Sequence, residues 1–291
     1  MTTDSHVFAS PPAGCAEDWT VPQGWADYTA EDHATWVTLY ERQMALLQDR
    51  ACPEFLAGLR ALDLHGGGIP DFAALNEKLS ALTGWTVVAV PGLVPENVFF
   101  DHLAQRRFPA GRFIRRADQL DYLQEPDIFH DVFGHVPMLC DPVFADYMVE
   151  YGRGGQRAAG LGQLEQLARL YWYTVEFGLL ETPAGLRICG AGIVSSATES
   201  RFALESPSPH RIGFDLERVM RTRYRIDDFQ QTYFVIPSLA ELLRVTLEDF
   251  TPVYARLAEQ PALAIDAILP GDRVIHRGDQ SHARLASAAA G

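Results

Sequence analysis

The sequence predicts a mainly α-helical protein with a few short β elements. Helix-start signals recur along most of the chain. Stretches rich in β-branched and aromatic residues, which are typical of strands, are fewer and shorter. With 47% hydrophobic and 21% charged residues among 291, the composition is that of an ordinary folded protein. We therefore expect helices to form most of the core.

The starts of the helices are the clearest local signals. Thr29 is followed three residues later by Asp32, the spacing at which two polar side chains cap a helix start reciprocally. The other starts carry a proline in or just before the first turn, at Pro53, Pro95, Pro126 and, after the capping residue Asp141, Pro142. The longest helical candidate spans residues 161–180, where leucine and aromatic residues recur at spacings of three and four.

The predicted strands are short, and the ends of the chain differ from its middle. The strand candidates are residues 85–90, the stretch around Phe113, residues 186–189 and residues 232–236. No internal repeat or long linker interrupts residues 26–260, which we expect to form one catalytic domain. Residues 1–25 are rich in Pro, Gly and small polar residues, and residues 261–291 are rich in Ala, so both are expected to be flexible tails.

Charge and hydropathy exclude several classes of protein. The net charge is −14, Lys78 is the only lysine and the arginines are scattered, so we expect no nucleic-acid or membrane partner. No apolar stretch reaches the roughly 18 residues of a membrane span, and no secretion signal is present, which predicts a cytoplasmic protein. The four cysteines form no C-x-x-C pair and are expected to be free thiols.

The densest group of possible metal ligands lies in residues 125–137. His130 and His135 are five residues apart, which on an α-helix separates their directions by about 140°. They can face one ion only if the helix stops between them, and Gly134 and Pro137 supply such a stop. The alternative is that both are core histidines bonded to the backbone.

A third ligand is available in Glu176, a lone carboxylate within an apolar and aromatic run. Burying that charge is costly unless a cation pairs with it; a buried arginine would also serve. Two histidines and one carboxylate are the ligands of non-haem Fe(II) oxygenases, with catalytic zinc as the competing assignment. The zinc-protease motif H-E-x-x-H is absent, because the histidines are five apart and Asp131 follows His130.

These residues resemble the catalytic domain of the pterin-dependent aromatic amino acid hydroxylases. The resemblance rests on His130 to Pro137 and on Tyr-Trp-Tyr-Thr-Val-Glu-Phe-Gly around Glu176. It extends in the family's order and spacing to segments 90–94, 122–127, 190–196 and 224–235, and covers roughly residues 26–255. Within the family, the chain is most similar to the short bacterial members that act on phenylalanine. The resemblance implies the catalytic-domain fold of this family.

The resemblance also implies the cofactors and partners. His130, His135 and Glu176 would be the catalytic iron ligands, holding Fe(II). Tetrahydrobiopterin, or a related tetrahydropterin, and O2 would be the other reactants. The short N-terminal segment and the absence of a C-terminal heptad pattern suggest a monomer.

Five residues would contact the pterin, as the resemblance implies. Phe99 would stack on the ring, since a planar heterocycle favours an aromatic face. Gly92 and Leu93 would offer backbone groups, Asp131 would reach the ring edge directly or through water, and Tyr171 would lie nearby. Asp131 and Glu96 depart from the residues that are common in the family. Without the resemblance, Phe99 could equally be a core residue.

The resemblance assigns the amino acid substrate to a further set of residues. Arg115, braced by Asp127, would bind the carboxylate as a fork, and Ser195 would complete the polar end. From sequence alone, the neighbouring Arg116 is an equal candidate. The wall around the ring would be formed by Phe108, Pro126, Trp172 and Ile226, with Leu123 where animal relatives usually have Thr.

The expected reaction is hydroxylation of L-phenylalanine to L-tyrosine. Tyrosine hydroxylases tend to have an acidic residue where Ile226 stands, and tryptophan hydroxylases tend to have Phe where Trp172 stands. Such pocket differences change preference by only about 1–3 kcal/mol, so both remain alternatives. Outside the family, the alternatives are a zinc hydrolase with the same three ligands and a non-catalytic module that binds carbonyl compounds or amino acids.

Overall fold

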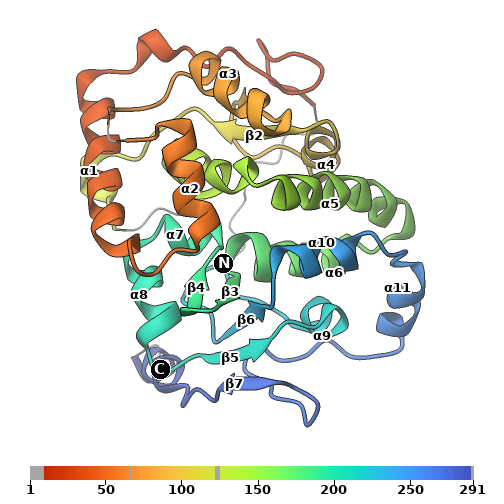
Figure 1. Cartoon of the computed structure of the whole chain (residues 1–291). Helices are drawn as coiled ribbons and strands as arrows, with labels where there is room; N and C mark the ends of the chain where they lie inside the picture. The colour runs from red at the N-terminus through yellow and green to blue at the C-terminus, as the bar shows by residue number, and fades with distance from the viewer. Residues whose placement is uncertain (1–9, 66, 122–124, 290–291) are drawn as a thin grey trace. The chain divides into compact units, whose positions relative to one another are not determined.

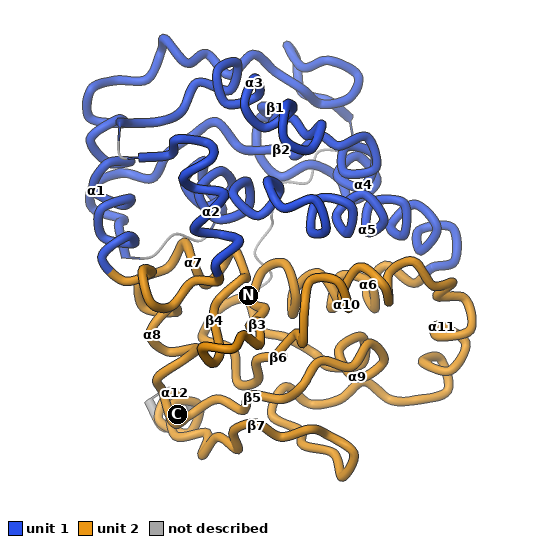
Figure 2. The backbone as a smooth tube through the Cα atoms, viewed as in Figure 1, with its two compact units in different colours: residues 1–45, 53–162 blue, residues 46–52, 163–291 orange. Residues whose placement is uncertain are grey.

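The computed structural model describes residues 10–65, 67–121 and 125–289, and its fold is mainly helical with short strands, as the sequence predicts (Figure 1). By its internal contacts, the chain divides into two compact units (Figure 2). Unit 1 comprises residues 1–45 and 53–162, and unit 2 comprises residues 46–52 and 163–291. No helix among the described residues is long and apolar enough to cross a membrane.

Unit 1 packs helices around a parallel pair of strands. The pair is β1 (Thr86–Val90) with β2 (Arg107–Gly111), connected through α4. The α-helices are α1 (Ala30–Leu47), whose last residues belong to unit 2, α2 (Pro53–Leu62), α3 (Phe72–Thr83), α4 (Glu96–Ala104) and α5 (Pro142–Leu161). The short helical segments are η1 (Trp25–Asp27), η2 (Ala117–Gln119), η3 (Phe129–His135) and η4 (Val136–Cys140).

The helix starts of unit 1 follow the predicted caps. The backbone N–H of Thr29 donates to Asp32 Oδ2 at 2.8 Å, and the N–H of Asp32 donates to Thr29 Oγ1 at 3.2 Å. Asp141 accepts from the first amides of α5 at 3.0 and 2.9 Å, with Pro142 as its first residue. At Pro126 the prediction is less accurate, because the π-helix that follows begins only at Phe129.

Glycines let the elements of unit 1 approach closely. A Cβ at Gly58 in α2 would lie 1.9 Å from the carbonyl oxygen of Pro137 in η4. A Cβ at Gly155 in α5 would lie 2.1 Å from the Phe100 ring in α4. The absence of these side chains brings α2 against the segment that follows His135, and α4 against α5.

Unit 2 is built on a five-stranded sheet of order β4-β3-β6-β5-β7. The strands are β3 (Leu179–Thr182), β4 (Gly185–Ile188), β5 (His210–Gly213), β6 (Thr232–Ile236) and β7 (Val274–His276). The central strand β6 is buried along its whole length and pairs in parallel with β3 and β5. The helices are α6 (Leu164–Tyr171), the π-helix η5 (Trp172–Glu176), α7 (Ala191–Val194), α8 (Ala197–Glu205), α9 (Leu216–Arg221), α10 (Leu239–Thr246), α11 (Thr251–Ala258) and α12 (Ser281–Ala289).

Two predicted elements differ from the structure. The helix expected over residues 161–180 is shorter: α5 ends at Leu161, Gly162 takes a left-handed conformation at φ 67°, α6 and η5 together cover residues 164–176, and β3 begins at Leu179. The strand around Phe113 lies earlier in the chain, at β2, and the carbonyl of Phe113 instead accepts from the N–H of Ile128 at 2.8 Å. The strands at 86–90, 185–188 and 232–236 agree with the prediction to within one residue at each end.

The two ends of the described chain have more structure than the expected tails. Within residues 261–291, β7 pairs antiparallel with β5, and α12 follows it. Within residues 1–25, the N–H of Val21 donates to the carbonyl of Ala89 in β1 at 2.9 Å. A three-residue strand and hydrogen bonds to distant parts of the chain leave no periodic pattern in the sequence, so the composition of these segments was a poor guide.

Candidate metal centre

His130 and His135 converge because the segment that carries them is a π-helix. In a π-helix each N–H bonds to the carbonyl five residues earlier, so side chains five apart lie over one another. The Nε2 atoms of the two histidines are 3.3 Å apart. The predicted helix stop at Gly134 is wrong, since η3 runs through His135 and is followed by η4, which contains Pro137. The histidines therefore meet as predicted, by a different backbone geometry.

Aromatic rings fix the π-helix η3 within unit 1. Phe129 and Phe133 stack at 4.6 Å between ring centroids, and Phe133 also contacts Phe55 of α2 at 5.6 Å. The ring of Phe108 in β2 lies 4.9 Å from that of His135. His135 is buried and His130 is half-buried, so one of the two imidazoles retains more access to solvent.

Glu176 is the last residue of the second π-helix, η5, where the N–H of Phe177 donates to the carbonyl of Trp172 at 2.8 Å. A Cβ at Gly190 would lie 2.4 Å from the backbone oxygen of Glu176, and one at Gly192 would lie 2.9 Å from the Phe177 ring. The Gly-Ala-Gly sequence at 190–192 therefore lets the backbone of α7 press against the ligand-bearing segment.

These three side chains form a group that can hold a metal ion. One ligand atom from each of His130, His135 and Glu176 lies within 4.8 Å of the others. Two neutral imidazoles and one carboxylate leave coordination positions open for small ligands, which fits non-haem Fe(II). The same set also fits a catalytic zinc ion, because zinc accepts the same nitrogen and oxygen donors.

Arg115 and Asp127 form a buried bidentate ion pair beside the first ligand. The Nε and Nη2 groups of Arg115 donate to Asp127 Oδ2 and Oδ1, both at 2.9 Å. Asp127 Oδ1 also accepts from the backbone N–H of His130 at 3.0 Å. Burial raises the pKa of Asp127, but the hydrogen bonds and charge of Arg115 outweigh it and hold that pKa below the ordinary 3.8. Arg116 instead pairs with Asp118 at the surface, so the structure distinguishes the two arginines.

The residues expected to contact the pterin lie in different settings. Asp131 Oδ2 accepts from the N–H of Gly111 at 2.7 Å, which fixes it at the end of β2. Leu93, in the turn after β1, is 46% exposed. Phe99 on α4 lies 5.9 Å from the buried Phe100 ring and is itself only half-buried. Tyr171 is the last residue of α6. A Cβ added at Gly92 would have no neighbouring atom within 4 Å, so packing among the described residues does not require glycine there.

The residues expected around the substrate ring belong to both units. Phe108 in β2 is buried, and Pro126 precedes η3. In unit 2, the Ser195 hydroxyl donates to the carbonyl of Ala191 at 2.8 Å, and Ile226 is 72% exposed. Leu123 lies outside the described residues.

Sequence reasoning missed two residues that hold Trp172. The Trp172 indole N–H donates to Gln230 Oε1 at 3.0 Å. Tyr224 stacks on the Trp172 ring at 4.4 Å with an interplanar angle of 18°. Both lie in segment 224–235, but neither residue type marks a site by itself. The only available signal was the resemblance of the whole segment to the family.

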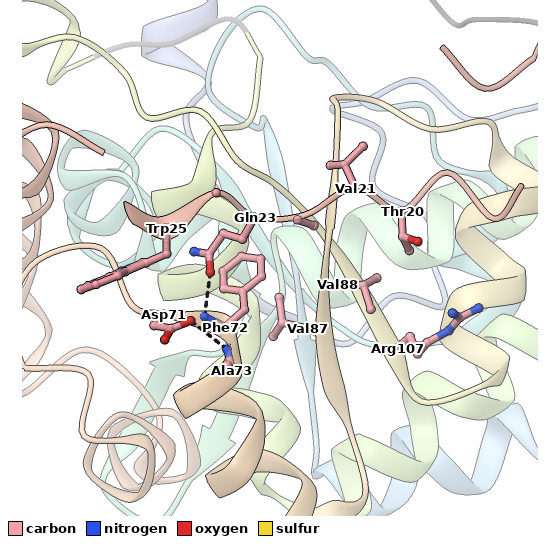
Figure 3. A pocket seen from close by; sticks show the side chains of 12 residues that line it. Thr20, Val21, Gln23, Trp25, Asp71, Phe72, Ala73, Val87, Val88 and Arg107 are labelled. Atoms are coloured by element: carbon pink, nitrogen blue, oxygen red, sulfur yellow. Dashed lines mark hydrogen bonds between the residues drawn. The ribbon is translucent and has the colours of Figure 1, made fainter. Parts of the chain in front are cut away.

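A cavity of about 460 Å³ in unit 1 is not part of this site (Figure 3). It is lined by residues 20, 21 and 23–25, by the start of α3, by strand β1 and by Arg107, and by none of the candidate site residues. The first amides of α3 already have partners there: Phe72 N–H donates to Gln23 at 2.8 Å, and Ala73 N–H donates to Asp71 at 3.0 Å.

Comparison with known proteins identifies the family. The model of the biopterin-dependent aromatic amino acid hydroxylase family matches residues 18–258. The phenylalanine-4-hydroxylase of Caulobacter vibrioides is 69% identical over 285 residues, which are 97% of this chain and 97% of the relative. That of Chromobacterium violaceum is 58% identical over 265 residues, covering 91% and 89%.

Solved structures agree as well. The iron- and phenylalanine-bound phenylalanine hydroxylase of Chromobacterium violaceum is 56% identical with a TM-score of 0.86, covering 91% of this chain and 96% of that one. The structure of that enzyme with bound oxidized Fe(III) is 59% identical with a TM-score of 0.87, at the same coverage. These matches confirm the family and the catalytic-domain fold predicted from the sequence. The chain belongs to the biopterin-dependent aromatic amino acid hydroxylase family.

Proposed function

We propose that this chain hydroxylates L-phenylalanine to L-tyrosine, using O2 and a tetrahydropterin at a non-haem Fe(II). The observation that carries the proposal is the group of His130, His135 and Glu176 in a member of this family. The relatives named phenylalanine-4-hydroxylase, at 58–69% identity over nearly the whole chain, support phenylalanine as the substrate.

The metal would be held by the two histidines and Glu176. Fe(II) and tetrahydropterin, when bound, supply electrons that activate O2, which does not attack an aromatic ring directly. The chain contributes two imidazoles and one negative charge, and leaves positions open at the metal. Asp127 fixes the first ligand, because its carboxylate accepts from the His130 backbone while it holds Arg115.

Arg115 would bind the substrate carboxylate. A guanidinium has five N–H donors, of which Asp127 takes two and the Leu120 carbonyl takes a third at 3.4 Å. Within the part of the chain that the structure describes, the other donors are available for a second carboxylate. Asp127 orients the guanidinium, so a planar carboxylate would meet a preformed fork. The Ser195 hydroxyl would accept or donate a hydrogen bond at the same polar end of the amino acid.

Apolar residues would surround the ring of the substrate. We assign this wall to Phe108, Pro126, Trp172 and Ile226, a set that suits an unsubstituted phenyl group. The pterin would lie against Phe99, with Gly92, Leu93, Asp131 and Tyr171 around its edge. Tight packing of these groups would exclude water and orient both rings, which is the protein's contribution to the reaction.

The test is aerobic turnover of the Fe(II)-loaded protein with tetrahydropterin and L-phenylalanine, L-tyrosine or L-tryptophan in parallel. We expect tyrosine from phenylalanine, and its loss in Glu176→Ala. Glu181→Ala is the matched control, because Glu181 is a half-exposed carboxylate on the next element, paired with Arg273. Hydroxylation of only another amino acid would refute the substrate assignment. Metal-dependent hydrolysis without O2 uptake would favour the zinc hydrolase instead.

Two further properties belong to the proposal. We place the enzyme in the cytoplasm, and we propose that it acts as a monomer. Size-exclusion chromatography with light scattering tests the second property, and a mass near 32.3 kDa is expected.

A further inference from the structure

The C-terminal segment of unit 2, residues 261–289, lies beyond the family match, which ends at residue 258. It contacts both ends of the loop of residues 223–231, which joins α9 to β6. That loop carries Ile226, Tyr224 and Gln230. Since two of these residues hold Trp172, the segment is connected to a wall of the proposed substrate site.

The start of the loop is fixed by backbone hydrogen bonds. Leu263 N–H donates to the carbonyl of Arg221 at 2.7 Å, and Arg223 N–H donates to the carbonyl of Leu263 at 3.1 Å. The Tyr173 hydroxyl donates to the carbonyl of Arg223 at 2.7 Å. These bonds fix the chain immediately before Tyr224.

The end of the loop is held by side chains at the start of α12. His282 Nε2 lies 2.8 Å from Asp228 Oδ1, and its ring lies 5.1 Å from the Phe229 ring. Phe229 stacks on Phe202 of α8 at 4.3 Å, and His282 contacts the same Phe202 at 5.3 Å. Gln280 Nε2 donates to the carbonyl of residue 231 at 3.1 Å. His282 therefore combines a polar and an aromatic contact with the loop.

The loop in turn holds Trp172 on two sides. Gln230 is buried; its Oε1 accepts from the indole N–H, and its Nε2 donates to the carbonyl of Arg225 at 2.9 Å. Tyr224 covers one face of the indole. Arg225 also pairs with Asp228, the residue that His282 binds, at 3.5 Å. A continuous series of contacts thus leads from His282 to the indole.

We propose that His282 is a positioning residue for substrate specificity. It fixes the 223–231 loop through Asp228 and Phe229, and the loop fixes the Trp172 indole against the ring of the bound amino acid. This inference rests on the proposed function, because it concerns how that site selects a phenyl ring. Pocket walls discriminate between rings of different size only when they are held in place.

The experiment compares wild type with His282→Ala, His282→Gln and the control Leu285→Ala. Leu285 lies on the same helix and is 71% exposed, so its truncation should disturb the packing of α12 little. For His282→Ala we expect the ratio of kcat/KM for phenylalanine over tryptophan to fall about fivefold, as for loss of one hydrogen bond of ordinary strength. The change should come mainly from a higher KM for phenylalanine. His282→Gln should restore the ratio, because its amide nitrogen can replace Nε2.

Near-UV circular dichroism of the same proteins without pterin gives a readout that is independent of turnover. We expect the tryptophan bands to weaken in His282→Ala and to return in His282→Gln. If wild type hydroxylates phenylalanine but His282→Ala matches Leu285→Ala in both readouts, the inference is overturned. If wild type hydroxylates no phenylalanine, the proposed function fails, and the near-UV spectra still decide whether His282 positions the indole.

A double-mutant cycle separates positioning from a general loss of structure. His282→Ala and Asp228→Asn are measured singly and together. Because the proposal routes the effect of His282 through Asp228, the two changes should be strongly non-additive in KM. Additive effects, or a failure of His282→Gln to restore KM, would show that His282 acts only on overall stability.

Discussion

Replacing Glu199 by glutamine is expected to remove a loss of stability that occurs in wild type as the pH rises toward 7. Glu199 lies in α8, is only 7% exposed, and accepts a hydrogen bond from the Tyr233 hydroxyl. Burial raises the pKa of Glu199 from 4.5 to about 7, although the hydrogen bonds from Tyr233 and from the Gln230 backbone partly oppose this. The folded protein therefore keeps this proton at pH values where the unfolded chain has lost it.

The sign and size of the effect follow from proton linkage. Between pH 4.5 and about 7 the native state binds one more proton than the unfolded state at this residue. The free energy of unfolding must then fall with rising pH, by about 1.4 kcal/mol per pH unit. The contribution is fully present below pH 4.5 and is lost by about pH 7. From about pH 5.5 to about pH 7 the expected loss is about 2 kcal/mol.

The assay is urea unfolding followed by circular dichroism at several values from about pH 5.5 to about pH 8, with a chelator present so that metal binding does not contribute. Glutamine has the shape of the protonated carboxyl and does not titrate, so the free energy of unfolding of Glu199→Gln should not show this fall with pH. Its advantage over wild type should therefore grow by about 2 kcal/mol from about pH 5.5 to above pH 7. Glu181→Gln, which changes a half-exposed carboxylate of the same unit, should follow wild type. Parallel curves for Glu199→Gln and wild type would refute the reasoning.

Three further outcomes are expected. Asp127→Ala should lower the free energy of unfolding by about 3–5 kcal/mol in urea titrations, because it leaves Arg115 buried without its carboxylate; a loss below 1 kcal/mol would contradict this. Gly58→Ala should lower stability by about 1–3 kcal/mol, since its Cβ would meet the Pro137 backbone, and should weaken iron binding measured by calorimetry. Gly160→Ala is its control, with no atom within 4 Å of the new Cβ, and should be neutral or stabilising by up to about 1 kcal/mol. Removing Fe(II) that is present at about 100 times its Kd should lower the free energy of unfolding by about 2.7 kcal/mol, and an unchanged melting curve would argue against a specific metal site.

Local signals predicted local structure well. The pairs Thr29 with Asp32, and Asp141 with Pro142, start helices because the interactions that cap them lie within four residues. Strands that form through distant partners were not predicted: β5 and β7 are three or four residues long and exist because they pair across more than sixty residues of sequence. The predicted helix over 161–180 was too long, because its hydrophobic spacing continues across Gly162, where the backbone turns and the helix has not yet begun.

The candidate ligands could be named from sequence because His and Glu are costly inside apolar segments and therefore conspicuous. The choice between Arg115 and Arg116 could not be made from the residues, since adjacent arginines have the same chemistry; burial against Asp127 separates them. Gln230 was missed for a physical reason. It is an ordinary polar residue whose role arises from a contact with Trp172, 58 positions away in the chain.

The two π-helices explain why the spacing argument predicted the convergence of His130 and His135 but gave the wrong backbone geometry for it. On an α-helix, residues four apart differ in direction by about 40° and residues five apart by about 140°, so only the shorter spacing aims two side chains at one point. His130 and His135 are one residue further apart than the α-helical spacing of four. The wider turn of the π-helix accommodates this residue and brings the two side chains back to the same side of the helix. The segment ending at Glu176 uses the same wider turn. Because π-turns are rare and occur frequently at functional sites, their presence in both ligand-bearing segments is itself structural support for a metal centre at these residues.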